Sequence, residues 1–272
     1  EQNSLNHIDG IYLYLTGNFK SCIETLKKID NNYSNLEYYY HLAIAYHSIQ
    51  STIFSYFYGQ KALQFFKSTL NILRIVDTET LLLVELNSKE PYDMDETRQQ
   101  YEKLLKVCES VNCIDRASKI YHNIAFEYYR RKRYSEAKQS YEKALELITE
   151  KTPHYLTSLN GYISACYKGM LLPEEELINL SKKGLKLTKQ NQDPRQMDFE
   201  IQLHTIYQNE KELYEYIEKT AIPILIASGN QFVKLHYEKK LFLYYVKSNQ
   251  KEKAFQLASD KMTSEKSYYH FE

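Results

Sequence analysis

The sequence predicts an all-α protein built from a row of helical hairpins, and three observations support this fold class. The chain of 272 residues contains only seven glycines and five prolines, too few for the many turns of a β-sandwich or barrel. Residues 121–152 carry apolar side chains at a 3.6-residue period in two short segments that a basic turn joins. The segment YEKLL at Tyr101 recurs as YEKAL at Tyr141, which indicates an array of similar units.

The hairpin at residues 121–152 combines small and large residues as close helix packing requires. Its alanines allow two helices to approach, and its tyrosines fill the gaps around them. Six positions match the tetratricopeptide pattern W-x2-L-G-x2-Y followed by A-x3-F, namely Tyr121, Ile124, Ala125, Tyr128, Ala137 and Tyr141. We therefore expect a tetratricopeptide-repeat array, a right-handed superhelix with the first helix of each hairpin on the concave side.

The same periodicity divides the chain into about seven hairpins within a single domain, residues 1–272. The predicted hairpins are 5–29, 36–67, 71–111, 121–152, 154–189, 195–227 and 231–262. Gly17 should end the first helix, and Asp93 or Asp95 should begin the helix that follows the segment SKEPYD. Pro173 is expected in the first turn of its helix, and residues 192–194 should break the chain.

Composition narrows the class of protein further. Lys and Arg together number 35, as do Asp and Glu, so the chain has no charge bias toward nucleic acid or membrane. Without a long apolar run or a signal peptide, we expect a soluble, cytoplasmic chain. The four cysteines form no C-x-x-C pair and are expected to be reduced structural thiols.

No catalytic motif occurs in the sequence. It lacks a glycine-rich phosphate loop, an H-E-x-x-H motif, a nucleophile elbow and a Cys/His cluster with ligand spacing. The acidic run Glu174–Glu176 fits a helix N-terminus better than a metal site. We expect neither an enzyme nor a bound cofactor or metal.

The strongest candidate for a site is the inward face of two successive first helices. Asn123 and Asn160 take equivalent inward positions there, although asparagine is a poor helix former. A side-chain amide offers a donor and an acceptor together, which matches an extended peptide backbone, while Arg130 would suit a carboxylate. In the alternative interpretation the two amides only bond across the groove or to water. The predicted peptide-binding residues are Asn123, Asn160, His122, Phe126, Tyr129, Arg130, Lys119, Ile163 and Tyr167.

The segments YHNIAFEYYRRKRYSEAKQSYEKALEL and SLNGYISACYKG, with the array, resemble the RRNPP family of Gram-positive peptide receptors. The resemblance implies that Asn123 and Asn160 bind the backbone of a short secreted signalling peptide that has been re-imported into the cell. Members of one type carry an N-terminal helix-turn-helix domain, which nothing in this sequence matches. The resemblance therefore implies DNA binding only through a domain absent from this chain, in a regulator of quorum sensing, sporulation or protease expression.

Two other functions remain open at this point. Rap-type members of the family act on a phosphorelay response-regulator protein, and an unrelated adaptor array would dock a partner's C-terminal tail. We also expect a homo-oligomer, a dimer or tetramer, since an end repeat must be covered. The aromatic segments SYYHFE and Tyr38–Tyr40 are the predicted covers.

Overall fold

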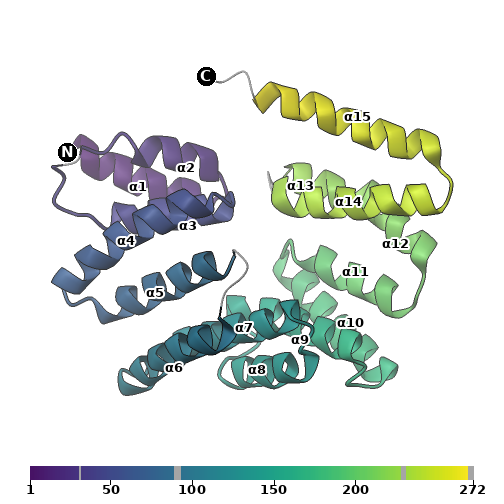
Figure 1. Cartoon of the computed structure of the whole chain (residues 1–272), viewed down its shortest axis with the longest axis horizontal. Helices are drawn as coiled ribbons and strands as arrows, with labels where there is room; N and C mark the ends of the chain where they lie inside the picture. The colour runs from purple at the N-terminus through teal and green to yellow at the C-terminus, as the bar shows by residue number, and fades with distance from the viewer. Residues whose placement is uncertain (31, 89–92, 228–230, 269–272) are drawn as a thin grey trace. The chain divides into compact units, whose positions relative to one another are not determined.

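The computed structural model describes residues 1–30, 32–88, 93–227 and 231–268, and all regular structure in these ranges is helical. The α-helices run in chain order as α1 Gln2–Leu15, α2 Phe19–Leu26, α3 Tyr38–Ser48, α4 Thr52–Ser68, α5 Ile72–Asn87, α6 Met94–Ser110, α7 Ile114–Arg130, α8 Tyr134–Glu146, α9 Pro153–Gly169, α10 Glu174–Asn191, α11 Gln196–Ile206, α12 Glu210–Tyr216, α13 Ile222–Ala227, α14 Gln231–Lys247 and α15 Lys251–Tyr268 (Figure 1). The predicted all-α array of helical hairpins is thereby confirmed. The segment 89–92, within the predicted SKEPYD break, and residues 269–272 of SYYHFE lie outside the described residues.

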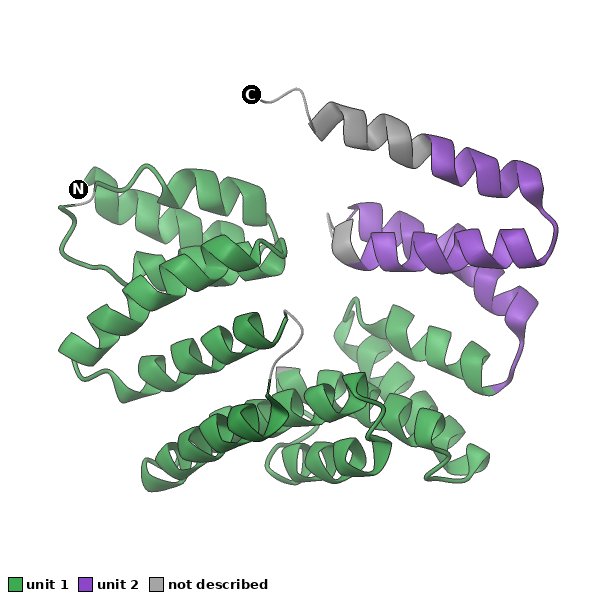
Figure 2. Ribbon diagram, viewed as in Figure 1, with its two compact units in different colours: residues 1–206 green, residues 207–272 purple. Residues whose placement is uncertain are grey.

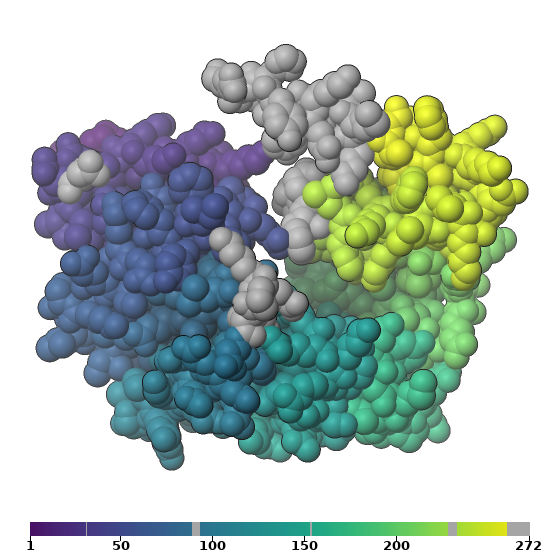
Figure 3. All heavy atoms as spheres, viewed as in Figure 1, coloured from purple at the N-terminus to yellow at the C-terminus, as the bar shows by residue number. Residues whose placement is uncertain are grey.

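The described residues form two compact units, residues 1–206 and residues 207–272 (Figure 2). The first unit contains five hairpins, from α1–α2 to α9–α10, and then α11; they follow one another as bands of colour in Figure 3. The second unit contains α12, α13 and the hairpin α14–α15. The sixth predicted hairpin, 195–227, is thus divided between the units, and a single domain remains a prediction.

The core of the fourth hairpin shows why these residues form an array. Ala125 and Ala137 are fully buried and pack with Tyr141, which is 2% exposed, and with Ala165 of the next hairpin. Gly161 makes this contact possible, because a Cβ atom there would lie 2.4 Å from Cζ of Tyr141. The predicted packing of small residues against large ones is therefore confirmed, and the Tyr141 ring contacts two successive hairpins.

Backbone closure ends most helices in the same way. One or two positions after such a helix, a residue adopts left-handed backbone angles, and the N–H of the following residue donates to the carbonyl five positions earlier. Such bonds of 2.8–3.0 Å run from Asn18 to Leu13, Ser51 to Tyr46, Asn71 to Phe66, Cys113 to Cys108, Arg133 to Tyr128, Leu171 to Cys166, Asp193 to Thr188 and Gln250 to Tyr245. The left-handed residues are Gly17, with φ of 77°, and non-glycine residues such as Leu70 and Met170, with φ of 54° and 52°.

These turns give a prediction about stability. Met170 is 92% exposed and left-handed, so Met170→Gly should raise the free energy of unfolding by about 1 kcal/mol by relieving backbone strain. Gly17→Ala should lower it by about 1 kcal/mol, since no atom of the described residues lies within 4 Å of the added Cβ and only the backbone is strained. Urea denaturation followed by circular dichroism measures both changes, and shifts of the same sign would contradict this account.

Local signals begin and interrupt the helices. The Asp93 side chain accepts bonds from Asp95 and Glu96 and so caps α6, as predicted. Pro173 precedes α10 as its N-cap instead of lying in its first turn. A π-helical turn, Ile217–Ala221, interrupts the last helix of the predicted hairpin 195–227. The turn lies just before Pro223, which has no N–H to donate to a carbonyl.

One predicted interface residue is internal. Tyr38 is 3% exposed and belongs to the core of the first two hairpins, where its ring lies 4.2 Å from that of Tyr39. Tyr40 packs against Phe66 and beneath the Arg74 guanidinium. The prediction that Tyr38–Tyr40 covers an end of the array is therefore wrong, because the first hairpin, α1–α2, already covers Tyr38.

Candidate functional site

Two neighbouring pockets in residues 1–206 are lined mainly by the first helices of the hairpins. The first, of about 220 Å³, is lined by His122, Phe126, Tyr129, Tyr141, Thr157, Asn160, Gly161 and Ser164. The second, of about 280 Å³, is lined by Tyr40, Ile44, His47, Val76, Asp77, Thr80, Leu81, Val84, Arg116, Lys119, Asn123 and His154. Helices α7 and α9 contribute residues to both pockets, and the two pockets together are the candidate site.

Asn123 has the property expected of a ligand-binding amide. It lies partly exposed on α7, lines the second pocket, and within the described ranges its side chain has no hydrogen-bond partner. An amide left open in a preformed pocket keeps its donor and acceptor available to a ligand. The alternative interpretation, in which the asparagine amide hydrogen-bonds to another side chain across the concave side, therefore does not apply to Asn123 in this structure.

Asn160 is engaged differently. Its side-chain oxygen and its backbone carbonyl both accept hydrogen bonds from Nε2 of Gln202 on α11, the latter at 2.8 Å. The same Nε2 atom lies 3.1 Å from the Ser164 hydroxyl. Asn160 lines the first pocket and Asn123 the second, so the two do not form a simple paired clamp here. Gln202 was not anticipated, since it comes from the following hairpin.

A histidine pair links the linings of the two pockets, because His122 lines the first pocket and His154 lines the second. The rings of His122 and His154 are 4.7 Å apart in an edge-on arrangement, and His122 Nδ1 bonds with the Ser158 hydroxyl at 3.1 Å. Burial, and then the neighbouring His154, lower the pKa of His122 to about 3. Burial, and then Lys119, lower the pKa of His154 to about 4. Both imidazoles are therefore neutral at pH 7, and the buried Nε2 of His154 has no hydrogen-bond partner in the part of the chain that the structure describes.

The cations are arranged differently from the prediction. Arg130 donates to the backbone carbonyl of Asn87 at 3.0 Å and lies 3.5 Å from the Glu127 carboxylate. It thus ties α7 to the end of α5 and lines neither pocket. Lys119 is exposed in the second pocket and forms no ion pair with any described residue. The available positive charge therefore comes from Lys119, one turn before Asn123.

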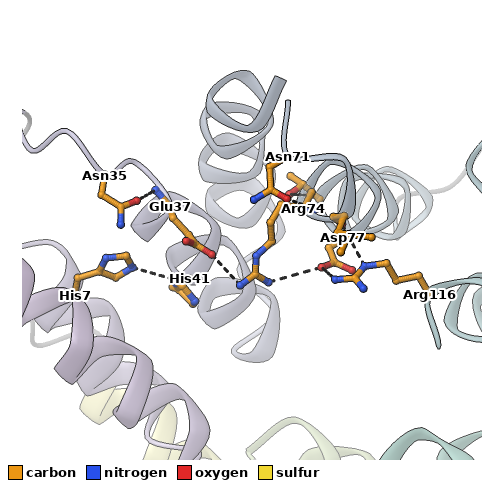
Figure 4. A network of polar contacts seen from close by, with 10 residues as sticks. His7, Asn35, Glu37, His41, Asn71, Arg74, Asp77 and Arg116 are labelled. Atoms are coloured by element: carbon orange, nitrogen blue, oxygen red, sulfur yellow. Dashed lines mark hydrogen bonds and ion pairs between the residues drawn. The ribbon is translucent and has the colours of Figure 1, made fainter. Parts of the chain in front are cut away.

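The second pocket borders a network of charged groups on three successive first helices (Figure 4). Arg74 on α5 reaches Glu37 at the start of α3 at 2.8 Å and Asp77 at 3.7 Å. Arg116 on α7 binds the same Asp77 carboxylate at 2.9 Å. The network fixes the side chains of Asp77 and Arg116 before any ligand arrives. Sequence reasoning missed both; the position of Arg116, three residues before Lys119 on one helix face, was the available signal.

The remaining predicted residues divide between pocket and core. Phe126 is 47% exposed, an open aromatic ring in the first pocket, and Tyr129 is half-buried beside it. Ile163 is 1% exposed and belongs to the core of the fifth hairpin, so its prediction as a contact residue is not supported by its position. Tyr167 is half-buried and donates its hydroxyl to the Thr205 carbonyl at 3.1 Å.

Comparison with known proteins gives likeness in structure alone. No family model matches the chain, and no curated protein sequence is significantly similar to it. The apo quorum sensor NprR from B. thuringiensis is similar over 93% of this chain and 73% of its own, with 21% identity and a TM-score of 0.71. NprR in complex with its cognate peptide NprX gives 22% identity and a TM-score of 0.70, over 93% and 74% of the two chains.

A third solved structure covers still more of the chain. A Rap protein complexed with Competence and Sporulation Factor is similar over 98% of this chain and 75% of its own, with 16% identity and a TM-score of 0.77. At these identities the likeness establishes the fold. Separately, none of the described helices combines the length and apolar character needed to cross a membrane.

Proposed function

We propose that this chain is the peptide-sensing part of a quorum-sensing regulator of the RRNPP type, most like NprR. A short re-imported signalling peptide binds along α7 and α9, and the bound form changes conformation or oligomeric state to switch gene expression in the cytoplasm. DNA is contacted only through a domain outside this chain. The observation that carries the proposal is the Asn123 amide, which has no hydrogen-bond partner among the described residues. It lies between Lys119, which has no ion-pair partner among them, and the open ring of Phe126.

The arrangement suits an extended peptide. Asn123 can donate to one backbone carbonyl and accept from one backbone N–H, which anchors the ligand without reading its sequence. Phe126 and Tyr129 offer apolar surface for a ligand side chain in the first pocket, and Lys119 offers charge for a carboxylate in the second. The neutral His122–His154 pair separates these two environments. Because the pockets are already formed, binding needs little ordering of the receptor.

Calorimetric titration with short peptides encoded by pro-peptide genes next to this gene tests the proposal. We expect one peptide of about five to ten residues to bind with micromolar or tighter affinity. Asn123→Ala should weaken its binding at least about tenfold, because a hydrogen-bond pair worth about 1.4 kcal/mol or more is lost. Asn179→Ala is the matched control, since Asn179 is exposed on α10, a second helix, and lines neither pocket. Equal losses in the two variants, or unchanged affinity in Asn123→Ala, would contradict the assigned site.

Likeness to a Rap protein over 98% of the chain supports a second candidate function, control of a phosphorelay response-regulator protein. This function would require a stable complex with a response regulator, or faster loss of its phosphate, in the absence of peptide. Size-exclusion chromatography and a phosphate-release assay measure the two effects. A complex that dissociates when peptide is added would support both functions in one chain. If neither effect is seen, control of a response regulator is ruled out and only the peptide-sensing function remains proposed.

We further propose that the chain forms a homo-oligomer through α1. Its exposed apolar residues Leu5, Ile8, Tyr12 and Leu15 are 49–76% exposed and follow the three- and four-residue spacing of a coiled-coil seam. Light scattering should report a dimer or larger assembly, and Ile8→Glu should shift it toward monomer. Phe255→Glu, at a residue 76% exposed on α15, is the control and should leave the mass unchanged. A monomer at micromolar concentration would refute this proposal.

A further inference from the structure

The turn between α6 and α7 places Cys113 against the apolar core cluster that contains Cys108. Asn112 has left-handed backbone angles with φ of 53°, and the Cys113 N–H donates to the Cys108 carbonyl at 2.9 Å. This closure characteristically places the side chains of its two bonded residues against each other. Here both of those residues are cysteine, with four residues between them.

The turn between α7 and α8 has the same backbone closure and shows that this closure brings the two side chains together. There Arg133 donates its N–H to the Tyr128 carbonyl at 3.0 Å, and its guanidinium lies 4.8 Å from the centre of the Tyr128 ring. At the α6–α7 turn, Cys113 packs against the core cluster that contains Cys108, and the neighbouring Cys113 thiol adds to the rise in the pKa of Cys108. Two backbone positions joined in this way are close enough for a disulfide.

The two thiols differ in access. Cys108 is 2% exposed in the apolar core of α5, α6 and α7, and burial raises its pKa to about 12. Cys113 is partly exposed at the first position before α7. An outer thiol that meets an oxidant and an inner thiol that resolves the product are the two parts of a redox site.

We propose that Cys108 and Cys113 form a reversible dithiol–disulfide site for hydrogen peroxide. The Cys113 sulfur attacks one peroxide oxygen, the O–O bond breaks, and Cys113 becomes a sulfenic acid as the first water leaves. The Cys108 sulfur then attacks the Cys113 sulfur, the S–O bond breaks, and a second water leaves. The two thiols lose two electrons and two protons in all, and the peroxide is reduced to two waters.

Mass spectrometry of the folded chain after treatment with hydrogen peroxide tests the site. Both cysteines lie in one tryptic peptide, residues 107–116, between Lys106 and Arg116. After quenching, denaturation and alkylation, this peptide should be two hydrogens lighter and carry no alkyl group. A thiol reductant should restore it. Cys22 and Cys166, both fully buried, are internal controls and should stay alkylated.

Two variants and one condition separate the proposal from its alternatives. Cys113→Ser should abolish the mass loss, and Cys108→Ala should leave Cys113 as a sulfenic acid that dimedone traps. Circular dichroism must show full helicity in the oxidised chain. The proposal is overturned if the treated native peptide carries two alkyl groups, if the disulfide appears only after helicity is lost, or if Cys22 or Cys166 is a partner.

Discussion

Tyr141→Ala is expected to lower the free energy of unfolding by about 3–5 kcal/mol, the cost of leaving a cavity where a large buried ring was. Tyr141 is 2% exposed and packs with alanines of two successive hairpins, so its loss should weaken both α7–α8 and the junction with α9. The ring also lines the first pocket, 5.3 Å from His122. Urea denaturation measures the change.

A second substitution, Gly161→Ala, distinguishes loss of the Tyr141–Gly161 contact from a general loss of stability. In the native background Gly161→Ala should destabilise by about 1–3 kcal/mol, because its Cβ would lie 2.4 Å from Cζ of Tyr141. In the Tyr141→Ala background the same change should be neutral or stabilising, because alanine is the better helix former and the ring is gone. A double-mutant cycle of the four proteins gives the coupling. Additive effects would contradict the ring-on-glycine contact.

Acidification is the second change with a large expected effect. His41 on α3 is 7% exposed, and its Nδ1 lies 3.1 Å from Nε2 of His7. Burial, and then the neighbouring His7 and Arg74, lower the pKa of His41 to about 3 from an ordinary 6.5. The unfolded chain therefore binds more protons below pH 6.5, and stability present above that pH is lost as pH falls toward 3. At pH 5 the loss from His41 alone is about 2 kcal/mol.

Other buried titratable groups also change the free energy of unfolding as pH falls. His122 and His154, with pKa values lowered to about 3 and 4, add losses of the same sign. Asp198 opposes them, because burial raises its pKa to about 6 and protonation at pH 5 relieves an unfavourable charge. Burial also lowers the pKa values of His7 and His236, so five histidines act against one carboxyl, and stability should fall between pH 7.5 and 5.

Urea titrations at a series of pH values between 7.5 and 5 measure this dependence. His41→Asn keeps a polar atom near the Nδ1 position but cannot titrate, so its stability should depend less steeply on pH than that of the native chain. Exposed His236 lies outside the first unit, and partial burial lowers its pKa as well, so His236→Asn is the comparison variant and should flatten the pH dependence less than His41→Asn does. A native stability that is unchanged down to pH 5, or equal slopes for native and His41→Asn proteins, would contradict the assignment.

The array could be predicted from the sequence because its signal is repeated and local. The spacing of Tyr121, Ala125 and Tyr128 is fixed by one helix face, and Asp93 caps its own helix. The turns carried less signal. Gly17 is recognisable, but Leu70 and Met170 occupy equivalent left-handed positions against their intrinsic preference, so only the closed backbone reveals them.

The site was harder to predict, since its chemistry depends on contacts between hairpins. Asn123 and Asn160 share an inward position, yet Gln202 occupies one amide and leaves the other open. Arg130 is drawn to the Asn87 carbonyl, an acceptor more than forty residues earlier in the chain. No helix pattern specifies such partners, because they depend on how neighbouring hairpins are stacked.

The backbone closure of the turns has a consequence for evolutionary divergence. A left-handed residue in such a turn is held by two main-chain hydrogen bonds, and its side chain contributes almost nothing to the packing of the array. The exposed side chains of Leu70 and Met170 illustrate this. Substitution there costs about 1–2 kcal/mol at most, and a stabilising change elsewhere in the array can offset it. Turn residues can therefore drift until descendants share little sequence while the helices still superpose. Relatives of such chains are found by comparing folds sooner than by aligning residues.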